Sequence, residues 1–169
     1  MDVDTIEAMP AVDTDATDFE HEYRQVHRAA FLLARQLGCP TEEAQDAVQE
    51  AALRAWRYRS GRHGPFRPWF LRIVYRTATR PRPRWLPLPV FWESRDLPGP
   101  ELESSVDSEL VAALGRLPPR QRAALWLRYC EDMSTASVGA VLGISEAAVK
   151  QLVLRARTAL KREWVPDGH

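Results

Sequence analysis

The sequence predicts an all-α protein in which two small helical modules are joined by a flexible linker. Apolar residues recur at spacings of three and four, as they do on one face of a helix. A proline-rich and then acidic stretch, residues 86–107, separates two such regions. Residues 134–162 are typical of two helices joined by a tight turn. The 169 residues suffice for two modules, each near the lower size limit for an independent core.

The chain begins with an acidic tail. Residues 1–17 contain five acids and no basic residue, with little periodicity, which predicts a disordered segment. From Asp18 the pattern changes, and apolar residues from Phe19 to Leu37 recur on one face. They predict a first helix that ends at Gly38.

A second helix is expected to begin with Thr41 as its cap, followed by two glutamates that suit the positive end of the helix dipole. One side of this helix is apolar. Another side carries Asp46, Gln49, Glu50 and Arg54. The default interpretation of that side is a solvated face, supported by an ion pair between Glu50 and Arg54.

A third helix follows a glycine-containing loop, with Pro68 at its first position and Pro81 ending it. Residues 54–84 contain ten arginines and no acid, interleaved with aromatic residues. Arginines contact phosphates and aromatic rings stack on unpaired bases, so this combination favours single-stranded or melted nucleic acid. Core packing is an equal alternative for Trp56 and Trp69.

These helices make up the first module, residues 18–85, and residues 86–107 form the linker. Fully extended at ~3.3 Å per residue, the linker could reach about 75 Å. The second module is expected over residues 108–164, with a short tail at 165–169. It begins with a short helix near Leu117 and a second helix whose buried side includes Cys130.

The most informative pattern is the helix pair that ends the second module. Ser134 and Ser145 can each cap a helix, and Gly143 permits the turn between them. Gly139 inside the first helix suggests that another part of the chain passes closely. Basic side chains lie on the outer faces of the pair. This is the helix-turn-helix arrangement, whose second helix enters the major groove of DNA; an ordinary helical hairpin is the alternative.

Charge is divided into blocks although the formal net charge is zero. Residues 24–92 carry 13 arginines against four acids, a net charge of +9, and residues 110–162 carry nine basic residues against three acids, a net charge of +6. Acidic segments lie before, between and after these two blocks. Two separate basic blocks indicate a polyanion that is contacted at two places.

The cysteines favour a reducing compartment. Cys39 and Cys130 fall in different modules without metal-ligand spacing, which argues against a disulfide framework, a zinc site or another cofactor. A redox role for either cysteine stays open. No apolar run reaches the ~18 residues that cross a membrane, and the N-terminus is acidic. We therefore expect a soluble, cytoplasmic protein without membrane insertion.

An enzyme finds little support in the sequence. The best candidate pattern is His21-Glu22 with His27, whose spacing differs from the two histidines of HExxH. There is also no glycine-rich loop of the kind that cradles phosphates.

The sequence resembles the extracytoplasmic-function (ECF) group of bacterial sigma factors, the two-module initiation subunits of RNA polymerase. The resemblance covers residues 18–84 and 108–162. It is carried by three strings that resemble region 4 of the family: LPPRQRAAL from Leu117, LGIS from Leu142, and RAR from Arg155. The strings VQE from Val48 and LRAWR from Leu53 resemble region 2.

By this resemblance the second module would read the −35 promoter element in the major groove. The candidate contacts are Ser145, Lys150, Gln151, Arg155 and Arg157. Lysine and arginine can bond guanine edges and glutamine can bond adenine, while any of them can also hold phosphates.

The first module would carry two further surfaces by the same resemblance. The residues that would dock on the largest subunit of core RNA polymerase are Asp46, Gln49, Glu50 and Arg54. The residues that would hold a base flipped from the non-template strand of the −10 element are Arg62, His63, Phe66, Trp69, Arg72, Arg76 and Arg80. An anti-sigma factor that clasps both modules is a further partner that the family allows.

Several positions depart from the family pattern. Arg76 stands where the family usually has Asn, Arg80 where it has Asp, and Pro81 ends a helix that usually continues. In the helix that would read the −35 element, Ala148 and Leu152 replace the usual Thr and Arg. The alternative function is therefore a sigma-like DNA-binding regulator or accessory factor with weakened −10 recognition. The promoter set and the activating signal are not fixed by the sequence.

Overall fold

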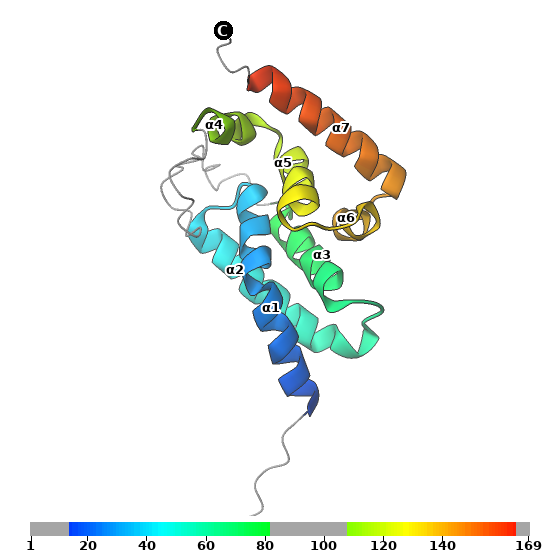
Figure 1. The fold of residues 1–169 in the computed structure, drawn as a ribbon. Coiled ribbons are helices and arrows are strands. Elements are labelled where there is room, and N and C mark those ends of the chain that lie inside the picture. The colour runs from blue at the N-terminus through cyan, green and yellow to red at the C-terminus, as the bar shows by residue number, and fades with distance from the viewer. Residues whose placement is uncertain (1–13, 82–107, 165–169) are drawn as a thin grey trace, which may run out of the picture.

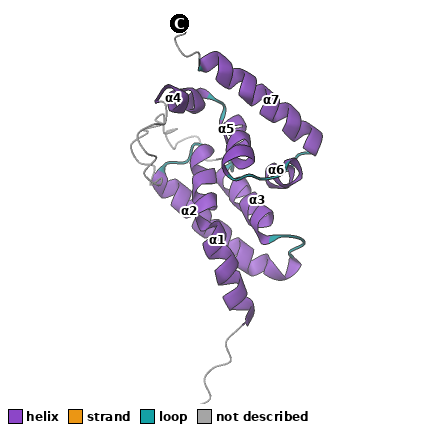
Figure 2. Ribbon diagram, in the orientation of Figure 1, coloured by secondary structure: helices purple, strands orange, loops and turns teal. Residues whose placement is uncertain are grey.

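A computed structural model of the chain describes residues 14–81 and 108–164 (Figure 1). All regular secondary structure in these two ranges is helical (Figure 2). The predicted linker, most of the predicted acidic tail and the predicted C-terminal tail lie outside them. We call residues 14–81 the N-terminal unit and residues 108–164 the C-terminal unit.

The N-terminal unit is a bundle of α1 (Thr14–Gln36), α2 (Thr41–Tyr58) and α3 (Phe66–Ala78), with the short 3-10 turn η1 (Arg59–Gly61) after α2. Each of the three helices packs on the other two. Their largest fully buried side chains are Leu33, Val48, Phe70, Leu71 and Val74. The buried residues of α2 and of α3 recur at helical spacing, so burial of an apolar helix face holds the bundle together.

The helix ends differ from the predicted ones in ways that matter for the site. Helix α1 begins at Thr14, four residues before Asp18, so Asp15 lies in its first turn. Helix α2 has Pro40 rather than Thr41 at its N-cap position, without a side-chain cap. Helix α3 ends at Ala78, and Arg80 therefore lies beyond it.

The C-terminal unit contains α4 (Ser108–Arg116), α5 (Pro119–Leu125), the π-helical turn η2 (Trp126–Cys130), α6 (Thr135–Leu142) and α7 (Glu146–Glu163). Helix α7 packs on α4, α5 and α6. The prediction that Cys130 is buried is wrong, because its side chain is exposed. A π turn takes more residues per turn than an α-helix, which shifts the side chains after Leu127 away from the buried side.

The two units pack against each other. Helix α6 lies on α3, and α1 contacts α5 and η2 (Figure 1). Buried apolar residues of both units form one continuous cluster. Arg122 of α5 is only 6% exposed. Its Nε donates to the Gln36 carbonyl at the end of α1 (2.9 Å), and its Nη1 donates to the carbonyls of Gly115 (3.1 Å) and Leu117 (3.3 Å). The sequence predicts two tethered modules and contains no local signal for this contact.

Candidate nucleic-acid interface

Helices α6 and α7 have the geometry of a helix-turn-helix. They are bent by 94° with respect to each other, within the ~90–120° of that motif. Both predicted serine caps are present, because the Ser134 hydroxyl accepts from the backbone N–H of Ser137 (3.1 Å) and the Ser145 hydroxyl from that of Ala148 (3.2 Å). Gly143 has a φ of +69°, a left-handed conformation that favours glycine.

Gly139 explains how tightly the turn closes on α6. A Cβ at this position would lie 2.6 Å from the backbone carbonyl oxygen of Ile144 and 3.5 Å from Cγ2 of Val149. The close neighbour that we predicted is thus mainly the backbone of the turn. The missing side chain lets the turn, and α7 after it, approach α6.

The outward surface of α7 carries the predicted −35 residues. Its buried side is formed by Val149, Val153 and Ala156. The exposed residues include all the candidates, namely Ser145, Lys150, Gln151, Arg155 and Arg157. Arg155 donates from Nε to the carbonyl oxygen of Gln151 (3.3 Å). Leu154 lies beside these side chains and is 57% exposed, a feature that the sequence analysis missed because a leucine at helical spacing usually faces the core.

The predicted polymerase-binding residues share one side of α2. Asp46 and Gln49 are exposed. Glu50 forms ion pairs with Arg54 (2.6 Å) and with Arg80 (3.1 Å). Leu53 lies on the same side with 70% exposure. We call this set the α2 face; its exposed leucine departs from the purely solvated surface that the charges alone indicate.

The predicted −10 residues lie around the loop after α2 and along α3, at different depths. Arg62, Trp69 and Arg72 are half-buried. His63, Arg76 and Arg80 are exposed. Together with Arg67 of α3, these residues form what we call the α3 face.

Phe66, which also belongs to the predicted −10 set, differs from the others because it is only 6% exposed. Its ring stacks on Phe70, with centroids 5.4 Å apart and planes 7° apart, and meets the edge of Phe19 at 5.5 Å. A buried ring with neighbours on its face and edge cannot stack on a base in this conformation. Phe66 instead supports the loop from below, with the Arg62 guanidinium 5.4 Å from its ring centroid.

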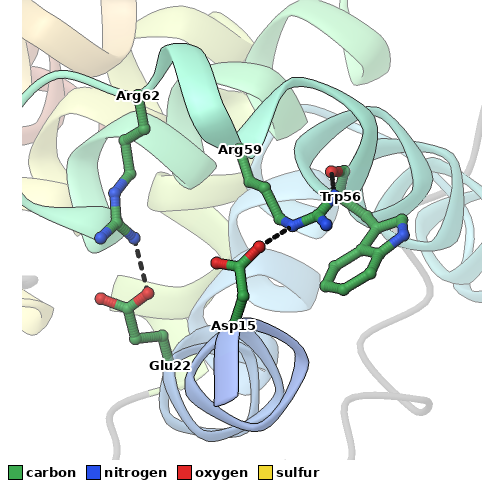
Figure 3. Close-up of polar contacts among 5 residues, drawn as sticks. All are labelled: Asp15, Glu22, Trp56, Arg59 and Arg62. Atoms are coloured by element: carbon green, nitrogen blue, oxygen red, sulfur yellow. Dashed lines mark hydrogen bonds and ion pairs between the residues drawn. The ribbon is translucent and has the colours of Figure 1, made fainter. Parts of the chain in front are cut away.

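Acids of α1 hold two arginines at the end of α2 and in the following loop (Figure 3). The Nε of Arg59 donates to Oδ2 of Asp15 (2.6 Å), and Nη1 of Arg62 donates to Oε2 of Glu22 (2.5 Å). The Arg59 guanidinium also lies 3.6 Å from the ring centroid of Trp56, within cation–π distance. Sequence reasoning missed both pairs because their partners are 44 and 40 residues apart.

The C-terminal unit supplies contacts to the α3 face as well. Arg67 forms an ion pair with Glu131, and Nη1 of Arg72 donates to the carbonyl oxygen of Ala140 (3.0 Å). Burial raises the pKa of the Glu131 carboxyl, although Arg67 and Arg28 act to lower it. Glu131 is thus a largely buried carboxyl that lies close to two cations.

The described residues contain no cluster of three or more His, Cys, Asp or Glu side chains placed to hold a metal ion. Cys39 is buried and Cys130 is exposed. Although Cys130 as a residue is exposed, its sulfur is partly shielded from water, and this shielding, followed by the neighbouring Glu131, raises the pKa of its thiol. Within the same ranges no single helix is long and apolar enough to cross a membrane, whereas the bent pair α6 and α7 meets that length and composition criterion only when taken together.

Comparison with known proteins identifies both units. Residues 19–82 match the model of Sigma-70 region 2, and residues 107–160 match that of Sigma-70 region 4. The ECF RNA polymerase sigma factor SigM of Mycobacterium tuberculosis strain H37Rv is 32% identical over 171 residues, covering 95% of this chain and 83% of SigM. The chain belongs to the ECF RNA polymerase sigma factors.

Other sigma factors show the same relationship. The RNA polymerase sigma-E factor of Streptomyces coelicolor is 31% identical, with 89% of this chain and 88% of that protein covered. SigG of M. tuberculosis is 34% identical over 152 residues, but the chain spans only 41% of its length. Among solved structures, the sigma factor RpoE from Bartonella quintana, in complex with the anti-sigma factor NepR, has a TM-score of 0.72 and 26% identity, with 90% of this chain and 99% of RpoE covered.

Proposed function

We propose that this protein is a sigma factor that binds core RNA polymerase and directs it to promoters. One observation carries the proposal: an exposed basic helix of a helix-turn-helix and an arginine-rich, aromatic face on a second helical unit belong to one chain. Promoter opening requires one contact that binds duplex DNA and another that binds a separated strand. Because core RNA polymerase is its partner, the protein acts in the cytoplasm.

The −35 element is assigned to the outward surface of α7. Lys150 and Gln151 project from the first half of the helix, which is the part that a helix-turn-helix inserts in the major groove, and Arg155 follows one turn later. Ser145 and Arg157 are placed to hold phosphates on either side. Leu154 adds an apolar contact suited to a thymine methyl group.

The −10 element is assigned to the α3 face. Trp69 is half-buried and supplies an aromatic ring for stacking, and arginines around it offer phosphate contacts. The residues assigned to this role are Arg62, His63, Trp69, Arg72, Arg76 and Arg80. Phe66 belongs beneath them as support, since its ring is buried.

Core RNA polymerase is assigned to the α2 face. Asp46 and Gln49 are exposed, and Glu50 and Arg54 hold each other in place. An exposed leucine in the middle of such a polar surface, Leu53, favours a protein partner over water alone.

Reconstituted transcription tests the proposal. The purified chain, core RNA polymerase and a library of promoter fragments from the source genome are mixed, and specific transcripts are expected. Replacing Gln49 and Leu53 with alanine should abolish both transcripts and co-elution with the polymerase. Exposed Gln25 and Arg24, on another helix, serve as the control pair. Transcription that persists without the α2 face would contradict the assignment.

The alternative is a sigma-like regulator that binds DNA without opening it. The early end of α3 at Ala78, together with the engagement of Arg80 by Glu50, favours this function. It predicts stable promoter binding by the chain and no transcript when polymerase is added. Permanganate footprinting of unpaired thymines on the promoter separates the two functions directly.

An anti-sigma factor is a further proposed partner. It is supported by the likeness to RpoE of B. quintana, which was solved in complex with the anti-sigma factor NepR. Co-purification of the tagged chain from its native host, followed by mass spectrometry, should recover such a protein.

A further inference from the structure

Tyr58, the last residue of α2, carries an aromatic ring that the fold leaves exposed. The residue is 62% exposed, more than any other Phe, Trp or Tyr in the described part of the chain. Within the same part its hydroxyl forms no hydrogen bond and its ring meets no other ring. The Trp69 ring, by contrast, packs against Phe66 with centroids 5.8 Å apart. The Tyr58 ring is therefore accessible to a ligand.

Tyr58 lies on the side of α2 that faces the bundle. Ala51 and Ala55 are buried on that side, and Tyr58 follows them at the helical spacing of four and three residues. Its ring is exposed because it lies at the end of the helix, past the last buried alanine. The ring is therefore adjacent to the loop that leads into α3 and is not one of the residues of the α2 face.

The backbone around Tyr58 is held by contacts of Arg59 (Figure 3). Nη1 of Arg59 donates to the Trp56 carbonyl oxygen (2.7 Å), and its guanidinium lies 3.6 Å from the Trp56 ring centroid. The Nε of Arg59 donates to Asp15 of α1 (2.6 Å). These contacts fix the residues on both sides of Tyr58. A ring on such a rigid support loses little conformational freedom when it binds.

The surroundings of Tyr58 are cationic. Residues 54–81 carry eight arginines and no acid. Arg57 is exposed and forms no hydrogen bond or ion pair with the residues that the structure describes. The N–H of Arg62 donates to the Arg59 carbonyl (3.1 Å), which turns the chain back after α2. Because four residues span at most about 14 Å, Tyr58 borders the α3 face at Arg62.

We propose that Tyr58 is a further base-stacking residue, on which an unpaired base of the strand held by the α3 face stacks, while Arg57 contacts a neighbouring phosphate. The inference rests on the assignment of the −10 element to the α3 face, and it extends that surface to the end of α2. An aromatic ring stacks on any base, so Tyr58 adds affinity without selecting the base. The run of arginines favours a nucleic-acid strand over a protein partner.

The test compares two exposed tyrosines in the full chain. Tyr58→Leu removes the ring but keeps an apolar side chain, and Tyr58→Phe keeps the ring. The matched control is Tyr129→Leu, since Tyr129 is 57% exposed in the C-terminal unit. Fluorescence anisotropy measures binding of a fluorescein-labelled oligo(dT) strand. Strands with a single 2-aminopurine at successive positions report stacking, because stacking quenches the fluorescence of that base.

We expect Tyr58→Leu to weaken strand binding about tenfold, the loss that follows removal of one stacked base. Tyr58→Phe should stay within about twofold of the parent, because the ring is retained. Tyr129→Leu should bind as the parent does. Quenching of 2-aminopurine at one position of the strand should disappear in Tyr58→Leu alone. Circular dichroism checks that each variant is folded.

Arg76→Ala separates this inference from the −10 assignment, because Arg76 is an exposed cation of the α3 face. It should weaken strand binding by about threefold at low salt through loss of a phosphate contact. If Arg76→Ala weakens binding and Tyr58→Leu does not, the stacking role is wrong and the −10 assignment stands. If neither variant weakens binding, both are wrong. Loss of co-elution with core RNA polymerase in Tyr58→Leu, with strand binding intact, would assign Tyr58 to a protein partner instead.

Discussion

The absence of a side chain at Gly139 sets the angle between α6 and α7. The nearest atom to a Cβ at this position would be a backbone oxygen of the turn, 2.6 Å away. Backbone in a tight turn cannot rotate aside as a flexible side chain can. A side chain at residue 139 would therefore push α7 away from α6 and change the 94° bend.

We expect Gly139→Ala to destabilise the chain despite alanine's better helix propensity. Overpacking costs roughly 1 to 3 kcal/mol, and the propensity gain returns up to about 1 kcal/mol. The free energy of unfolding, measured with urea, should fall by about 1 kcal/mol. Gly61→Ala is the control, because nothing lies within 4 Å of its added Cβ. Equal stability of both variants would contradict the close approach.

Arg155 offers a test of how α7 reads DNA. Arg155→Ala should weaken promoter binding by about tenfold or more if the guanidinium bonds a guanine edge, since such contacts are worth roughly 1 to 3 kcal/mol. Binding to core polymerase should not change. Anisotropy with promoter duplex and co-elution with polymerase measure the two effects, and exposed Arg120 supplies the control Arg120→Ala. If both interactions fall equally, Arg155 does not belong to the DNA surface.

Helix α1 carries out two tasks with different parts of its surface. Its apolar side completes the bundle, while Asp15 and Glu22 reach the arginines at the end of α2 and in the loop after it (Figure 3). The acids can either shield those arginines from DNA or hold them in a productive position. Both carboxylates are partly exposed, so either effect is modest and depends on salt.

We expect the two acids mainly to shield Arg59 and Arg62 from DNA rather than to position them for it. The double variant Asp15→Asn with Glu22→Gln should bind oligo(dT) about twofold more tightly at low salt, and the gain should disappear at high salt. Glu20→Gln is the control, since Glu20 pairs with Arg24 on the same helix. Weaker binding in the double variant would instead show that the acids position the arginines.

The features that could be predicted from sequence are those encoded locally. The serine caps at residues 134 and 145 and the glycine turn at 143 each depend on a few neighbouring residues, and all three were predicted. The α2 and α7 surfaces follow from helical spacing. Pairs such as Arg62 with Glu22 join distant segments, and no local pattern specifies them. The burial of Phe66 was missed for the same reason, because its neighbour Phe19 comes from another helix.

The contact between the two units exists only in the complete chain. Arg122 is the most buried polar residue in this contact. Its guanidinium serves three carbonyls, of which only that of Gln36 belongs to the other unit. Burial lowers the pKa of Arg122. Loss of one of these three bonds would still leave the buried cation with two acceptors. Loss of the side chain would leave all three carbonyls without this donor, which is the more costly change.

Arg122→Ala should therefore lower the free energy of unfolding by about 2 to 4 kcal/mol, because buried carbonyls lose their donor and a cavity remains. Urea denaturation of the full chain measures this loss. The neighbouring exposed Arg120→Ala should change it by less than about 0.5 kcal/mol. Similar effects of the two substitutions would contradict the bridging role of Arg122.

The bonding of Arg122 is divided unequally between the two units. When α1 and α5 part, the guanidinium keeps its bonds to Gly115 and Leu117, which travel with it. The Gln36 carbonyl stands at the last residue of α1, where incoming water can replace the lost donor. One bond of Arg122 thus joins the two units, while its bonds to Gly115 and Leu117 stabilise the C-terminal unit itself.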